Sequence, residues 1–262
     1  MSRDRLRRRD VLRALAAIGG LALSGCDRLA SEPRVRSVLD VATSLTYRMQ
    51  RLLIGADRLA REYSEADISP AFRPNGSTDP RDEEYVKLAG NHFADWRLKV
   101  HGLVERELSL SLEDLRALPT RTQITRHDCV EGWSCIGKWT GVPLSQILSR
   151  AGVKPEARLV VFHCADTLDD GGDSNDPEII RYYESIDLID GAHPQTILAY
   201  DMNGKPLTVP HGAPLRLRLE RQLGYKMAKY LMRVELARSV ADLHGGRGGC
   251  WEDRGYQWYA GI

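Results

Sequence analysis

The chain has 262 residues, of which 28% are charged and 42% hydrophobic, and its formal net charge is +1. This composition is typical of one folded domain of ordinary size, with no low-complexity run or internal repeat. Residues 1–25 contain six arginines and two aspartates, so they contribute +4 and the remainder carries −3. The mature part therefore lacks the basic surplus that nucleic-acid binding requires, and we expect no such partner.

The N-terminus has the pattern of an export signal. A basic head is followed by an apolar run, A-L-A-A-I-G-G-L-A-L, that is too short to span a bilayer permanently. Arg8-Arg9-Asp10-Val11-Leu12-Arg13 fits the twin-arginine pattern, although a merely basic signal head is the alternative. Leu23-Ser24-Gly25-Cys26 resembles a lipoprotein cleavage site, which predicts a lipidated Cys26 that anchors the protein to a membrane. An ordinary cleavage site with a nearby cysteine remains the alternative.

A long amphipathic helix follows the signal. Apolar residues recur every three or four positions between Val35 and Tyr63, which predicts one helix over that range, ended before Pro70. We expect this helix to pack on the surface of the domain. A spacer from the lipid anchor or a docking helix for a membrane partner are the other interpretations.

Strands and short helices alternate irregularly in the rest of the chain. The ranges 96–104, 158–162 and 215–219 have strand patterns, the last with leucines on one face and arginines on the other. Asn203-Gly204 predicts a hairpin turn. Ser111 with Asp114 predicts one helix start, and Pro143 begins another helix that Gly152 can close. These elements predict an α+β fold of mixed sheets with short helices.

The segment R-H-D-C-V-E-G-W-S-C holds two of the five cysteines, Cys129 and Cys135. A structural zinc site is disfavoured because paired C-x-x-C spacing is absent. A disulfide is allowed in an exported chain, and a cysteine nucleophile would need a histidine base such as His127. A thiolate ligand to a redox metal is the remaining interpretation. From these residues alone the alternatives stay open.

Several separated motifs resemble one enzyme family. They are F-R-P-N-G from Phe72, C-V-E-G-W-S from Cys129, W-T-G-V-P-L from Trp139, L-A-Y-D-M-N-G-K-P-L from Leu198, H-G-A-P-L-R-L from His211, and G-Y-K from Gly224. In this order they resemble the sulfite oxidase superfamily, most closely the branch of periplasmic methionine-sulfoxide reductase catalytic subunits. The resemblance covers about residues 68–240 and implies the molybdopterin-binding fold of that family.

The resemblance implies one molybdenum held by one molybdopterin and by the thiolate of Cys129, the residue expected to be both catalytic and the metal ligand. A thiol bound to a high-valent metal is deprotonated, which agrees with this role. The implied cofactor-binding residues are Arg73, Asn75, Gly76, Cys164, His211, Arg216, Gly224, Tyr225 and Lys226. Arg216 and Lys226 are the cations expected near the cofactor phosphate, and the backbone at Gly224 is expected to approach it closely. Cys164 stands where the branch has a hydroxyl residue, so a side-chain hydrogen bond there is in doubt.

The implied reaction is two-electron oxygen-atom transfer on a small-molecule substrate, with reduction of a sulfoxide or related S- or N-oxide preferred. Sulfite oxidation and a non-catalytic molybdopterin-binding envelope protein are the alternatives. No C-x-x-C-H motif occurs, so we expect a separate electron-transfer partner, for which a membrane haem protein is one candidate. We expect a monomer on the periplasmic side of the bacterial inner membrane.

The expected organisation is a signal peptide with lipobox over residues 1–26 and a helical segment over 27–67. The oxidoreductase domain follows over 68–240, and a C-terminal tail over 241–262 packs back onto it.

Overall fold

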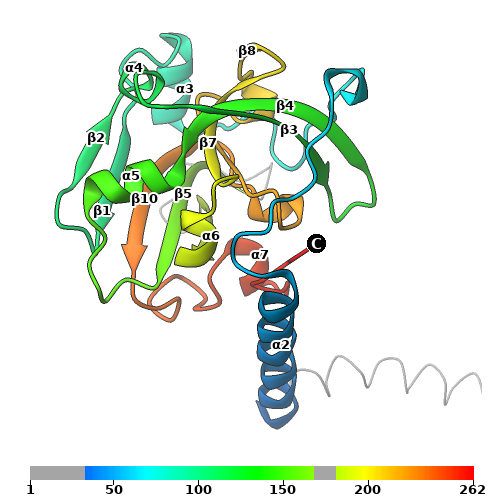
Figure 1. Ribbon diagram of the computed structural model, residues 1–262. Helices are drawn as coiled ribbons and strands as arrows, with labels where there is room; N and C mark the ends of the chain where they lie inside the picture. Colours follow the sequence, from blue (N-terminus) through cyan, green and yellow to red (C-terminus); the bar gives the residue numbers. More distant parts are fainter. Residues whose placement is uncertain (1–32, 168–180) are drawn as a thin grey trace, which may run out of the picture. The chain divides into compact units, whose positions relative to one another are not determined.

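The computed structural model describes residues 33–167 and 181–262 (Figure 1). The predicted twin-arginine motif and the lipobox with Cys26 lie outside the described residues. The chain forms two compact units, Met1–Ile54 and Gly55–Ile262, and each is described by itself.

Helix α2, Pro33–Ile54, is the described part of the first unit. The prediction of one helix up to Tyr63 was wrong in its length. Gly55 adopts a left-handed φ of +76°, which ends a helix at little steric cost. Residues after it belong to the second unit, where Tyr63 N–H donates to Ile124 O at 2.8 Å. None of the described helices is long and apolar enough to cross a membrane.

The second unit contains two five-stranded sheets, which confirms the expected α+β class. The first sheet has the order β2-β1-β10-β5-β6, and β1 and β10 are parallel neighbours. Its strands are β1 Leu98–Gly102, β2 Leu108–Leu110, β5 Leu159–Thr167, β6 Arg181–Asp187 and β10 Leu231–Ala237. The β1–β10 pairing joins segments that are far apart in the sequence, a contact that no local pattern predicts.

The second sheet has the order β3-β4-β7-β8, and β9 also pairs with β7. Its strands are β3 Arg121–Asp128, β4 Ser134–Pro143, β7 Ile197–Met202, β8 Lys205–Pro206 and β9 Arg216–Arg218. Strand β4 is the long bent strand across the upper part of Figure 1. The predicted hairpin is confirmed, because Asn203 and Gly204 connect antiparallel β7 and β8 with φ of +51° and +76°.

Short helices surround the sheets. The α-helices of the second unit are α3 Glu83–Gly90, α4 Leu112–Arg116, α5 Leu144–Ala151, α6 Leu188–Ala192 and α7 Cys250–Asp253; the 3-10 turns are η1 Glu65–Asp67, η2 Val209–His211 and η3 Gly224–Lys226. Both predicted helix starts are confirmed. Ser111 and Asp114 form a capping box at α4, and Pro143 precedes α5, which Gly152 closes.

The main core lies between the sheets and α5, where Trp96, Val100, Ile147, Phe162 and Leu217 are fully buried. Each such side chain contributes about 1.5–3 kcal/mol through removal of apolar surface from water. A smaller cluster holds Phe72 edge-on against Trp139, with ring centroids 5.3 Å apart. This smaller cluster places the 72–76 loop beside β4, and so beside the turn that carries Cys129.

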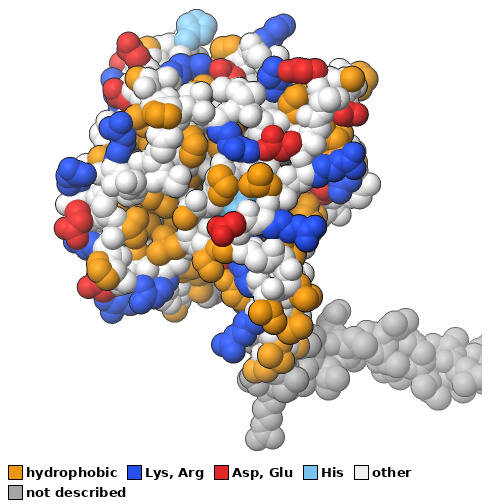
Figure 2. Space-filling model, in the orientation of Figure 1, with side chains coloured by type: hydrophobic (Ala, Val, Ile, Leu, Met, Phe, Trp, Pro, Cys, Tyr) orange, Lys and Arg blue, Asp and Glu red, His pale blue; other side chains and the backbone are white. Residues whose placement is uncertain are grey.

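The face shown in Figure 2 carries basic and acidic side chains interspersed with one another, in keeping with the small net charge.

Candidate functional site

Cys129 is the first residue of the turn that joins β3 to β4. Its N–H donates to Trp133 O at 3.0 Å, and its carbonyl accepts from Gly132 N–H at 3.1 Å. The Trp133 indole N–H donates to Glu131 Oε2 at 2.9 Å, which fixes that side of the turn. These bonds hold Cys129 half-buried at the end of a regular hairpin, a rigid support for a ligand atom.

The environment of the Cys129 thiol has opposing effects on its pKa. Burial raises the pKa above its ordinary value, while the backbone N–H groups of Glu131 and Val130 and the charge of Arg73 favour the thiolate. Because the net direction is upward, the protonated thiol is the resting form at neutral pH, and a bound metal must displace its proton. The N–H groups of Glu131 and Val130 are nevertheless placed where they can stabilise a negatively charged sulfur. Cys129, Cys135, Cys164 and Cys250 are all free thiols.

Cys129 lines a cavity of about 80 Å³. Of the cofactor-binding residues expected from the sequence, the structure brings Asn75, Gly76, Gly224 and Tyr225 to its wall. The cavity is smaller than a typical cofactor site of about 300–1,000 Å³. Tyr182, Tyr225 and Trp251 are the aromatic side chains in its lining.

Gly224 is required here by a close approach between two segments. A Cβ at this position would lie 2.4 Å from the imidazole of His127 and 3.2 Å from Asp128 O. The fully buried His127 ring also lies against the Met227 sulfur, with Nδ1 to Sδ at 3.3 Å. This packing brings the Gly-Tyr-Lys turn against the end of β3, next to Cys129.

Among the residues expected to bind the cofactor, Arg216 and Asn75 contain buried atoms without a hydrogen-bond partner in the described chain. Arg216 donates through Nη1 to His211 O at 3.0 Å, but its Nε and Nη2 have no protein partner. Asn75, in the cavity wall, has a buried Oδ1 without a partner. Such groups are costly when left unpaired, so their presence points to a polar ligand with both acceptors and donors.

Positive charge gathers around Arg216. The guanidinium is fully buried, and burial together with the neighbouring Arg218 lowers its pKa to about 9, so it stays charged at neutral pH. Lys229 is almost fully buried in the cavity wall and donates to Ser77 O and to Pro210 O. Burial and the charges of Arg216 and Lys229 lower the pKa of His211. A buried surplus of cations favours an anionic ligand such as a phosphate.

His211 lies beside this cationic group and supports the 72–76 loop. Its Nε2 lies 3.0 Å from Phe72 O, and its Nδ1 lies 2.9 Å from Thr208 Oγ1. Because the Phe72 carbonyl can only accept, Nε2 carries the proton and Nδ1 accepts from the hydroxyl. His211 thus positions the loop that carries Asn75 and Gly76.

Lys226 does not reach the cavity. Its side chain is fully buried, and Nζ donates to Glu184 at 2.5 Å and to Glu252 at 2.6 Å. Burial alone would lower the pKa of Lys226, but the two carboxylates reverse this and raise it. Burial also raises the pKa of Glu184 well above its ordinary value. Lys226 is therefore held by acidic side chains of the protein itself and not by a ligand.

Two other expected residues lie at the margin. Arg73 is exposed, 3.6 Å from Glu131, with its guanidinium 5.4 Å from the Trp133 ring centroid, so it covers the outside of the Cys129 turn. Cys164 is buried and lines a different cavity of about 640 Å³. Tyr182 lines both cavities.

Several residues of the cavity wall were not among the cofactor-binding residues expected from the sequence. Lys229 is the most informative of them, because a lysine between Met227-Ala228 and Tyr230-Leu231 interrupts an otherwise apolar run. Asp166 also lines the cavity and is buried. Trp251, from the C-terminal tail, contributes an aromatic side chain to the wall.

The sequence of the chain is similar to those of known proteins. A family model described as "Oxidoreductase molybdopterin binding domain" matches residues 86–244, more than half of the chain. The "Putative protein-methionine-sulfoxide reductase subunit YedZ1" of Azospira oryzae is 36% identical over 97% of this chain and 87% of its own length. The "Protein-methionine-sulfoxide reductase catalytic subunit MsrP" of Xanthomonas axonopodis pv. citri is 29% identical over 90% and 71%, respectively.

A solved structure, the sulfane dehydrogenase SoxCD of Paracoccus pantotrophus, is 26% identical and covers 55% of this chain and 39% of its own, with a TM-score of 0.48. The overlap is partial, and the family assignment rests on the sequence matches.

The chain belongs to the molybdopterin-binding oxidoreductases of the sulfite oxidase family. It is a molybdenum-dependent oxidoreductase whose cofactor is Mo-molybdopterin, in the part of the superfamily near MsrP. The site fits this cofactor in its chemistry. In the cavity wall Cys129 offers its sulfur and Asn75 an acceptor without a partner, while Arg216, which is not in that wall, has two donor nitrogens without a partner in the described chain.

Proposed function

We propose that this enzyme reduces sulfoxides, with methionine sulfoxide as the preferred substrate class. The observation that carries the proposal is the position of Cys129 in the wall of one cavity with Asn75, Gly76, Gly224 and Lys229. The names of its relatives support the direction of the reaction, because both the Azospira and the Xanthomonas proteins are named as methionine-sulfoxide reductase subunits.

Molybdopterin, when bound, supplies two-electron oxygen-atom transfer, and the protein supplies binding, orientation and electrostatics. Cys129 contributes its thiolate to the molybdenum, while the N–H groups of Glu131 and Val130 stabilise the negative sulfur. Arg216 and Lys229 balance the negative charge of the cofactor. Asn75 would offer its buried Oδ1 as an acceptor to the cofactor. Tyr182 and Trp251 limit the access of water and shape the approach of substrate.

The proposal includes a location. The predicted twin-arginine signal would export the chain in folded form, and lipidation of Cys26 would hold it at the periplasmic face of the inner membrane. Electrons would then come from a separate partner, for which a membrane haem protein fits both the anchor and the absence of a haem-attachment motif in the sequence. We further propose that the enzyme acts as a monomer, with the domain limits given by the sequence analysis.

The decisive experiment compares the wild-type enzyme with Cys129→Ser and Cys135→Ser. Cys135 lies in the same hairpin but outside the cavity wall, so its variant is a matched control. We expect stoichiometric molybdenum in the wild type and in Cys135→Ser, and its loss in Cys129→Ser. Activity is measured on methionine sulfoxide with a reduced dye and on sulfite with an oxidised acceptor.

Turnover of methionine sulfoxide that disappears with Cys129→Ser supports the proposal. If sulfite is oxidised and no sulfoxide is reduced, the direction proposed is wrong. A molybdenum-loaded protein inactive on both substrates would instead support a non-catalytic envelope protein.

A further inference from the structure

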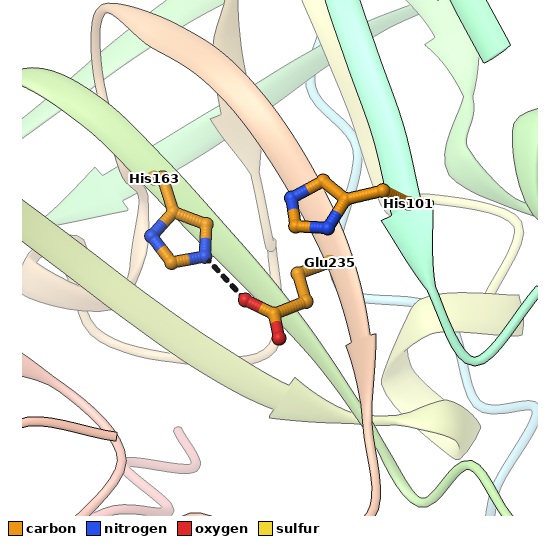
Figure 3. Close-up of side chains that lie close together, drawn as sticks. All are labelled: His101, His163 and Glu235. Carbon is orange, nitrogen blue, oxygen red and sulfur yellow. Dashed lines mark hydrogen bonds and ion pairs between the residues drawn. The ribbon is translucent and has the colours of Figure 1, made fainter. Parts of the chain in front are cut away.

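Three metal-ligating side chains converge on the first sheet, away from Cys129 (Figure 3). They are His101 of β1, His163 of β5 and Glu235 of β10. One ligand atom from each residue lies within 4.8 Å of the other two. None of the three lines the cavity that contains Cys129.

The strand register places the three side chains on one face. His101 pairs directly with Glu235 across the parallel β1–β10 pair. Glu235 pairs with Val161 of β5, and His163 is two residues further along the same strand. Side chains two positions apart on a strand point to the same side of the sheet, so the backbone itself determines this convergence.

The protonation and hydrogen bonding of His101 and Glu235 favour the binding of a cation. His163 Nε2 lies 2.8 Å from Glu235 Oε2, and that contact lowers the pKa of the Glu235 carboxyl. Burial lowers the pKa of His101, so its imidazole is neutral at physiological pH, and its Nε2 is buried without a hydrogen-bond partner. A neutral imidazole with an unshared nitrogen beside a carboxylate is a competent ligand pair.

Charges of both signs lie near the three side chains. Glu107 favours positive charge at His101, whereas Arg233 opposes it. The His101 and His163 rings are stacked with centroids 6.3 Å apart, and the side chains of His163 and Glu235 are 16% and 29% exposed. An ion from solvent can therefore reach them.

We propose that His101, His163 and Glu235 form a binding site for a divalent transition-metal ion, Zn²⁺ in the first instance. Two imidazoles and one carboxylate form a common three-ligand zinc set, with water in the fourth position. Ligands of a tetrahedral zinc lie about 3.3 Å apart, so adjustments of about 1 Å in these side chains assemble the site. Binding through Nε2 of a neutral His163 requires its ring proton to move to Nδ1, and no proton is released.

The ion would join three neighbouring strands, including the β1–β10 pair that connects the start and the end of the domain. Because it binds the folded chain and not the unfolded one, Zn²⁺ is expected to raise the thermal unfolding temperature. This role is independent of the reaction at Cys129.

The test titrates the molybdenum-loaded, full-length enzyme with Zn²⁺ by isothermal calorimetry and records the unfolding temperature with and without Zn²⁺. The variants are His101→Gln and Glu235→Gln. The control is His92→Asn, an exposed histidine with φ of +55°, a conformation that asparagine tolerates. Changes outside the ligand shell of metal sites already weaken binding about 10–100-fold, so each ligand variant is expected to lose at least that much affinity.

Tight binding of one Zn²⁺ that both ligand variants weaken and the control retains supports the site. Absence of binding, or equal binding by Glu235→Gln and the wild type, overturns it. Glu235→Gln keeps the size of the side chain and an acceptor for His163, so it decides the question alone if His101→Gln does not fold.

Discussion

Arg216 and Lys226 look alike in the sequence but differ in the structure. Both were expected beside the cofactor phosphate, and both are completely buried. Lys226 has two carboxylate partners within 2.6 Å, whereas Arg216 has one carbonyl partner at 3.0 Å and two nitrogens without any in the described chain.

The difference separates a structural cation from one that is available to a ligand. A buried charge is tolerated only if it is paired and hydrogen-bonded, and the protein itself meets that condition for Lys226. For Arg216 the condition is met only when an anion binds. We therefore expect replacement by methionine to reduce protein stability at position 226 and cofactor binding at position 216.

The largest effect is expected for Lys226→Met. Its removal leaves Glu184 and Glu252 facing each other in the interior, and breaking a buried ion pair in this way costs about 3–5 kcal/mol. The free energy of unfolding of the cofactor-free protein, measured in urea, should fall by that amount.

Glu184→Gln is the matched control for Lys226→Met. Because burial holds Glu184 toward its protonated form and Gln retains the acceptor for the Ser185 N–H, we expect a much smaller loss. If Lys226→Met is as stable as the wild type, the ion pairs of Lys226 do not stabilise the fold. Lys226 would then again be a candidate for binding the cofactor.

A smaller effect of a different kind is expected for Arg216→Met. Hydrogen bonds to charged groups contribute about 1.5–3 kcal/mol, which corresponds to about 10–150-fold weaker cofactor binding. Molybdenum retention after dialysis should fall, while the cofactor-free protein keeps its stability or gains some, because an unpaired buried charge is removed.

Arg218→Met on the same strand provides the contrast to Arg216→Met. Arg218 donates to Glu220 at 2.7 Å and 2.9 Å with both side chains fully buried, so its loss should destabilise the cofactor-free protein. If Arg216→Met destabilises the cofactor-free protein as much as Arg218→Met does, the guanidinium of Arg216 stabilises the fold. Arg216 would then not differ from Lys226 in being available to a ligand.

The sequence predicts local features of this molecule well and distant pairings poorly. The Asn203-Gly204 hairpin and the Ser111 cap depend on neighbouring residues, and both are confirmed. The partners of Lys226 lie 42 and 26 residues away, on β6 and in the C-terminal tail, so no local pattern marks its side chain as paired.

The same distinction applies to the site. Asn75, Gly76, Cys129, Gly224 and Tyr225 belong to motifs recognisable in the sequence, and the structure brings them to one cavity. Lys229 and Trp251 reach the same cavity only through the packing of the last strand and the tail, which the spacing of residues does not reveal.

His193 shows a third way to bury a group that can carry positive charge, namely to keep it neutral. Its Nδ1 accepts from Gln195 N–H, and its Nε2 lies 3.2 Å from Arg58 O. Burial, together with the charge of Arg221, lowers its pKa below the ordinary value of 6.5. Protonation of Nδ1 would remove the acceptor for Gln195.

The smallest effect follows from this shift and depends on pH. Below about pH 6.5 the unfolded chain binds a proton at His193 before the folded chain does, so stability is lost as the pH falls, by up to about 1.4 kcal/mol per pH unit. In His193→Asn, Oδ1 can replace the Nδ1 acceptor but does not titrate. Urea unfolding at about pH 7.5 and about pH 5.5 should therefore show a smaller acid loss for His193→Asn than for the wild type, and an unaltered loss for His92→Asn. If all three proteins lose the same unfolding free energy between the two pH values, the folded chain tolerates a protonated His193. His193 would then not be an example of a buried group that is kept neutral.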